Sequence, residues 1–296
     1  MDELAKTTTT QPAREFIFRG NAVAAGGFLT KLNGAPVVLD KQRVTVHGES
    51  SLPIIGGISH SLVARPELAF PKIIEYGACS TVAEGTGDTK STGTTLYASV
   101  QQVRVTNSPS PADNVPALQS VSFLADRLAI SARSYHPNPG APQFQLLNEP
   151  DTTGMSLLLT PLKGTPVNVP LHLTFDPAYL SPCTMDDLDA RFMGDRKFFD
   201  DYCASGAASG QLVFGKSKLP RTPEGYVVTS IVTSIRRGEQ TIRGNVLVEK
   251  GLGTITFGKV IMNGDSRRVT LVRIKLGSRE EGFATFAGTD SNGIWN

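Results

Sequence analysis

Five residues near one another in the sequence carry side chains that could perform nucleophilic chemistry: His47, Glu49, Ser50, Ser51 and His60. An imidazole beside a carboxylate can take the proton of a hydroxyl and turn it into a nucleophile. His47 and Glu49 share a face if their strand continues, because side chains alternate along a strand. Whether His60 lies near these residues depends on the path of the chain between Ser51 and His60, which includes a proline and a Gly-Gly pair. The cluster gives one hypothesis, a hydrolase-like enzyme, and its alternative, a polar loop at a sheet edge.

The other catalytic and ligand-binding motifs are incomplete. Residues 85–91 resemble a phosphate-binding loop ending in Lys-Ser, but Thr89 stands where such a loop needs glycine. No Gly-x-Ser-x-Gly pentapeptide of a hydrolase occurs. The histidines and cysteines lack the spacings of metal ligands, and the acidic residues 186–189 lack the glycine and distal glutamate of a calcium loop. The sequence therefore predicts no cofactor and no metal site, and it favours a role without catalysis.

Charge and cysteine content limit the partners and the compartment. The 296 residues contain 29 Lys and Arg against 27 Asp and Glu, so the net charge is only +2 and no nucleic-acid partner is indicated. The three cysteines are odd in number and widely spaced, which fits a reducing compartment. No apolar stretch approaches the roughly 20 residues of a membrane helix, and the amino terminus lacks a secretory signal. These features predict a cytoplasmic protein without a membrane span.

The elements that must position such side chains are mostly strands. Residues 226–235, 239–248, 252–262 and 268–276 are separated by turn residues and predict a meander, in which Leu271 points opposite to Val272 and Ile274. Residues 184–203 predict the clearest helix, because its apolar residues recur on one helical face. The predicted fold is mainly β, an antiparallel sandwich or barrel built from meanders, with one prominent helix near residues 184–203.

The domain organisation follows from the proline-rich and Thr-rich stretches. Residues 1–14 predict an extended amino-terminal tail, and residues 15–296 a β-rich domain. Residues 107–116 contain three prolines and mark a long connection or a boundary between two packed halves. One large domain and two packed halves both agree with the length of the chain.

The segments Ser50-Ser51-Leu52-Pro53 with Gly56-Gly57, His136-Pro137 and residues 266–278 carry a resemblance. On these segments the chain resembles uncharacterised bacterial all-β proteins of similar length. The resemblance implies a bacterial β-rich protein and adds no mechanism.

Three function hypotheses from different classes follow. The first is a non-enzymatic structural or scaffold protein that self-associates through β edges and its amino-terminal tail, because edge strands offer unpaired backbone groups to a second copy. Its partner is then the protein itself. The second is a barrel or sandwich that binds a small apolar ligand under a helical lid. The third is the hydrolase-like enzyme centred on the His47–His60 region.

Overall fold

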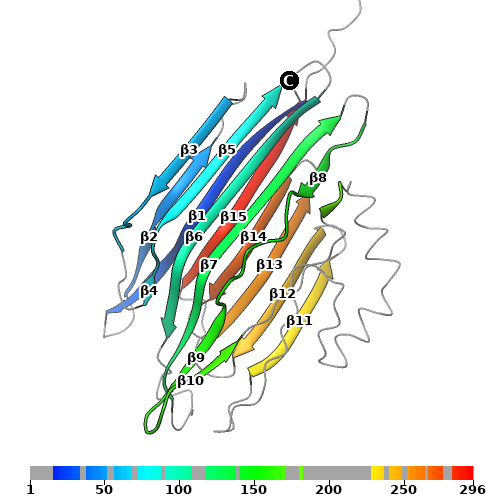
Figure 1. Ribbon diagram of the computed structural model, residues 1–296. Helices are drawn as coiled ribbons and strands as arrows, with labels where there is room; N and C mark the ends of the chain where they lie inside the picture. Colours follow the sequence, from blue (N-terminus) through cyan, green and yellow to red (C-terminus); the bar gives the residue numbers. More distant parts are fainter. Residues whose placement is uncertain are drawn as a thin grey trace, which may run out of the picture.

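Two antiparallel β-sheets pack face to face in the computed structural model (Figure 1). The predicted mainly-β antiparallel fold built from meanders is thus confirmed, and its two layers make it a sandwich. The predicted tail at residues 1–14 and the predicted helix near residues 184–203 lie outside the described residues. The structure describes residues 16–33, 38–51, 57–68, 73–87, 91–107, 118–137, 140–170, 180–182, 228–236, 240–248, 253–263, 266–275 and 282–295.

The seven-stranded sheet joins the first two described strands to the last five. Its strands are, in spatial order, β11 (Val228–Arg236), β12 (Gln240–Val248), β13 (Gly253–Asn263), β14 (Ser266–Lys275), β15 (Gly282–Trp295), β1 (Phe16–Asn33) and β2 (Val38–Ser51). The strands β11 to β15 follow one another as a meander, which confirms that part of the sequence prediction. β1 then pairs antiparallel with β15, so strands distant in sequence lie side by side inside this sheet.

The eight-stranded sheet is built from the middle of the chain. Its strands are β3 (Gly57–Val63), β4 (Ile74–Glu75), β5 (Cys79–Gly87), β6 (Ser91–Asn107), β7 (Leu118–Pro137), β8 (Gln143–Leu146), β9 (Ser156–Pro161) and β10 (Val167–Pro170). The main path runs β10-β9-β7-β6-β5-β3, with β4 paired to β6 and β8 paired to β7. β6 and β7, which flank the proline-rich stretch, pair with each other along nearly their whole length.

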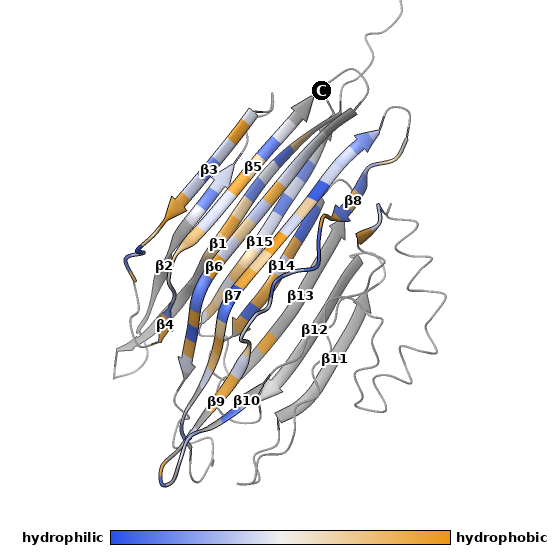
Figure 2. Ribbon diagram, in the orientation of Figure 1, coloured by the Kyte–Doolittle hydropathy of each residue, from blue (hydrophilic) through white to orange (hydrophobic). Residues whose placement is uncertain are grey.

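The two layers run in similar directions and enclose one interior. Strands of both sheets follow the same diagonal in Figure 1, which is the aligned type of sandwich packing. Orange and blue residues alternate along β5, β6 and β7 in Figure 2, as expected for strands with one buried and one solvated face. The contacts between layers join β1, β2, β14 and β15 to β3, β5, β6 and β7.

The interior has two chemically different ends. At one end, which we call the aromatic end, the ring of Tyr76 meets the ring of Phe286 edge-on at 6.2 Å between centroids. Ile74, Val105 and Phe123 complete this end, each at most 2% exposed. At the other, the hydroxyl end, buried serines and threonines of both layers lie among the apolar residues: Ser50, Thr81, Thr94, Ser134, Thr289 and Ser291.

The hydroxyl end is held by contacts between side-chain oxygens of the two layers. Ser50 Oγ lies 2.8 Å from Thr81 Oγ1, and Ser291 Oγ donates to Ser134 Oγ at 2.5 Å. Gly20 of β1 allows close approach here, because a Cβ at this position would stand 2.7 Å from Leu96 Cδ2. Small residues therefore bring the layers close enough for direct hydroxyl contacts.

A row of residues that the strand pairing skips crosses the seven-stranded sheet between these two ends. On neighbouring strands the skipped residues are Gly48, Ala24, Ala287, Leu271 and Gly258. Gly48 and Ala287 have left-handed φ angles of 60° and 51°. Each of these five strands therefore contains one extra residue at the same level, which acts like a bulge shared by β2, β1, β15, β14 and β13.

This row corrects one prediction. Strict alternation placed Leu271 and Val272 on opposite faces, yet both are 0% exposed. Val272 pairs with the inward-facing Phe286, and Leu271 is the extra residue of β14. The alternation shifts by one position at Leu271, and a period-two pattern cannot anticipate that shift.

Candidate functional site

The outer edge of β3 is the first candidate site. β3 is the terminal strand of its sheet and pairs only with β5 among the described residues. Ile58 and Leu62 are 70% and 73% exposed, although both are large and apolar. Figure 2 shows hydrophobic residues toward both ends of β3 with hydrophilic ones between. An edge strand of this kind presents unpaired backbone groups together with apolar side chains.

Register identifies the face on which these side chains lie. Ile58 pairs with Glu84 and His60 with Val82, while the buried residues of β5 are the intervening Thr81 and Ala83. Directly opposite residues of a pair share one face of the sheet. Ile58, His60 and Leu62 therefore project from the outer face of the eight-stranded sheet.

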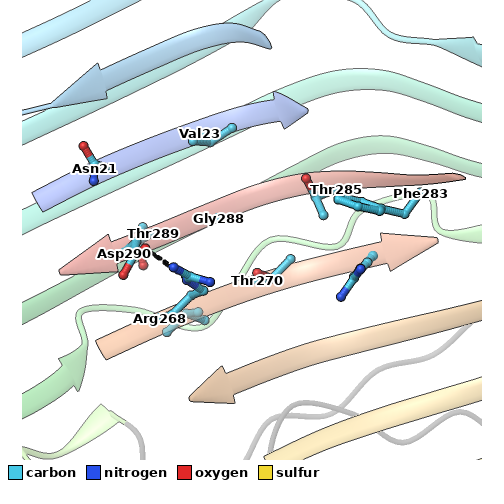
Figure 3. A pocket seen from close by; sticks show the side chains of 11 residues that line it. Asn21, Val23, Arg268, Thr270, Phe283, Thr285, Gly288, Thr289 and Asp290 are labelled. Carbon is cyan, nitrogen blue, oxygen red and sulfur yellow. Dashed lines mark hydrogen bonds and ion pairs between the residues drawn. The ribbon is translucent and has the colours of Figure 1, made fainter. Parts of the chain in front are cut away.

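A depression of about 400 Å³ on the outer face of the seven-stranded sheet is the second candidate (Figure 3). It is lined by side chains of three neighbouring strands, β1, β15 and β14. Arg268 donates to Asp290 Oδ2 from both Nε and Nη2, at 3.0 and 2.7 Å. The guanidinium of Arg273 lies over the ring of Phe283, 4.3 Å from its centroid. Two guanidinium groups and one carboxylate give this depression a net positive charge.

The row of skipped residues explains how the depression is assembled. Arg268 and Arg273 are five positions apart, an odd spacing that would place them on opposite faces of a regular strand. The extra residue Leu271 restores them to one face, and Ala287 does the same for Thr285 and Asp290 on β15. The irregularity of the sheet and the depression are therefore one feature.

The structure describes the side chains of four of the five predicted catalytic candidates and places these four on two sheets and on different faces. Glu49 and Ser51 are exposed on β2, whereas Ser50 between them is 2% exposed and bonded to Thr81 inside the sandwich. His60 projects from the other sheet, on its outer face. The backbone of His47 pairs with Ala25, and its side chain lies outside the described residues.

No family model, curated protein or solved structure matches this chain. The resemblance to bacterial all-β proteins therefore stays a prediction. In the part of the chain that the structure describes, three or more His, Cys, Asp or Glu side chains nowhere gather as a metal site would require. Within the same ranges, no helix is long and apolar enough to cross a membrane.

Cys79 and Tyr76 are two titratable side chains buried near each other in the interior. Burial raises the pKa of the Cys79 thiol to about 12. Burial, and next the proximity of Cys79, raises the pKa of the Tyr76 hydroxyl. Thiols are nucleophilic as thiolates, so this cysteine is inert at neutral pH.

Sequence reasoning predicted association through β edges without identifying β3, and it missed the depression. The signal for the edge was present, because residues 57–63 place Ile58 and Leu62 at an even spacing, which puts both on one face, and contain no Lys, Arg, Asp, Glu or Pro. Edge strands normally carry such residues to prevent pairing. The depression had no comparable signal, because its arginines have the wrong spacing for a common face unless the extra residue is known.

Proposed function

We propose that this protein is a non-enzymatic structural or scaffold protein that self-associates through the outer edge of β3. The observation that carries the proposal is the pair of exposed apolar side chains, Ile58 and Leu62, on an edge strand without a charged or proline residue. Pairing two such edges would satisfy backbone groups and cover apolar surface at once.

The strands at the other three ends of the two main strand paths carry features that oppose pairing. β10 has four residues and ends in Pro170, which has no backbone N–H. β2 contains Asp40, Lys41 and Arg43, and β11 ends in Arg236. Among the four strands that end the two main paths, β3 is therefore the one best suited to accept another strand. β4 and β8, which lie off these paths, have only two and four residues.

The test compares two charge insertions. Ile58→Lys combined with Leu62→Lys places two cations on the β3 edge, and Leu162→Lys places one at another exposed apolar position, 65% exposed, away from β3. We expect the unaltered protein and the Leu162 variant to associate and the double variant to be monomeric, as measured by light scattering over a concentration series. A monomeric unaltered protein would overturn the proposal. Removing residues 1–14 in the same assay measures the contribution of the tail.

A second candidate function, binding of an anionic ligand, is favoured by the depression on the seven-stranded sheet. Arg273 and Phe283 offer a cation beside an aromatic ring, and the local net charge is positive. A ligand with a carboxylate on an aromatic ring would match both groups. Benzoate should shift NMR signals of β14 and β15 residues, and Arg273→Gln should remove these shifts. Unchanged spectra at millimolar benzoate would dismiss this candidate.

A further inference from the structure

The sequence of β3 is nearly symmetric about its central residue. Its seven residues read Gly-Ile-Ser-His-Ser-Leu-Val, with His60 in the middle. Ser59 and Ser61 flank it as identical neighbours, and Ile58 and Leu62 follow as residues of equal size and hydrophobicity. Such symmetry has a consequence for pairing, because in an antiparallel two-fold pair each residue meets the residue at the mirrored position of the second copy.

Pairing two copies of this edge is restricted to a few registers. A two-fold axis perpendicular to the sheet keeps the outer faces of both copies on one side, and directly opposite residues share a face. The register centred on His60 pairs all seven residues and sets Ile58 against Leu62 twice. A register centred on Ser59 or Ser61 shortens the pair to five residues and sets an apolar residue against His60. The first register is therefore favoured by both backbone pairing and side-chain matching.

We propose that two copies of this chain join their eight-stranded sheets into one continuous sheet through antiparallel β3 strands, with the two-fold axis at His60. This inference rests on the proposed function and adds the partner and its register. The interface is small and consists largely of backbone pairing, so the expected dissociation constant is on the order of micromolar.

Cysteine cross-linking tests the register. In a chain with Cys183 and Cys203 replaced by serine, the remaining Cys79 is 1% exposed and does not compete. We expect His60→Cys to form a dimer on oxidation or with a short bis-maleimide. Ile58→Cys alone should not cross-link, because two copies of residue 58 would be about 13 Å apart along the strands. A mixture of Ile58→Cys and Leu62→Cys should cross-link again.

Circular dichroism confirms that each cysteine variant is folded. A dimer that cross-links through Ile58→Cys alone would overturn this register but leave self-association standing. A monomer at all concentrations would overturn both.

Discussion

The aromatic end and the hydroxyl end of the sandwich hold the same two sheets together by different means. At the aromatic end, Tyr76 and Phe286 fill the space between the layers with rings. At the hydroxyl end, Ser50 and Ser291 reach the opposite layer through hydrogen bonds. Apolar packing is insensitive to the direction of contact, whereas a buried hydroxyl stabilises the fold only when its partner is in place. The packing at the aromatic end therefore tolerates small displacements of the layers, whereas the hydroxyl end demands a specific alignment of them.

A substitution at the aromatic end should cause the largest loss of stability. Phe286→Ala removes a side chain that is 1% exposed and leaves a cavity against Tyr76. We expect a loss of about 3–5 kcal/mol in the free energy of unfolding, measured by urea denaturation. Phe286→Leu, which keeps most of the volume, is the matched control and should lose less. Equal losses in the two variants would contradict a packing role for the ring.

Alkaline pH should lower the free energy of unfolding through the buried Cys79 and Tyr76. The pKa of Cys79 is raised to about 12, and that of Tyr76 is raised as well, because burial disfavours their charged forms. The unfolded chain ionises at lower pH than the folded chain, so stability present at neutral pH is lost as pH rises above about 8.5 for the thiol and about 10 for the phenol.

Each group should then cost about 1.4 kcal/mol per pH unit until the folded state also ionises. Urea denaturation at pH 7.5, 9 and 10.5 measures this slope. Cys79→Ala should remove the part of the slope that begins near pH 9, and an unchanged slope in this variant would assign the effect to other groups.

A single hydroxyl at the hydroxyl end should have an intermediate effect. Ser50→Ala leaves Thr81 Oγ1, on a residue that is 0% exposed, without the partner now 2.8 Å away. We expect a loss of about 1–3 kcal/mol in the free energy of unfolding. Adding Thr81→Val should recover part of it, since both polar groups are then absent. A double variant as unstable as the sum of the single variants would show that the two hydroxyls act independently.

The smallest effect should have the opposite sign. Thr94 Oγ1 is buried at the hydroxyl end and makes no hydrogen bond to the residues that the structure describes. Thr94→Val keeps the shape and removes this oxygen, so we expect a gain of about 1 kcal/mol. Thermal unfolding followed by circular dichroism measures it, with Ser134→Ala as a control whose oxygen accepts a hydrogen bond from Ser291. A loss of stability in Thr94→Val would point to a buried water at this position.

The fold could be predicted from local patterns, and the sites could not. The alternation in residues 226–276 and the turn residues between its strands were enough to predict the carboxyl-terminal meander. Burial at Leu271 and Val272 escaped prediction because it depends on a row of extra residues that spans five strands. The residue pattern of a single strand does not reveal such a row, because the row is defined by pairing between strands. The depression depends on the same row, and for that reason its arginines could not be paired from sequence.

The predicted catalytic candidates illustrate a second limit. His47, Glu49, Ser50, Ser51 and His60 are close in sequence, but neighbours on a strand alternate between the interior and the solvent. Ser50 lies in the interior, and His60 lies on a strand of the other sheet. Proximity in sequence indicates a catalytic cluster only when a turn or helix gathers the side chains, and two strands in different layers do not.

The pairing of β1 with β15 sets the order in which this protein can form during its synthesis. Thr285 donates to the carbonyl of Gly26 across 259 residues of chain. β1 therefore waits, with one edge uncovered, until β15, which lies about 259 residues later in the chain, has left the ribosome. Contacts of such sequence separation are slow to form. The meander of β5, β6 and β7, in which each strand pairs with the next one in the chain, can fold while the edge of β1 is still uncovered.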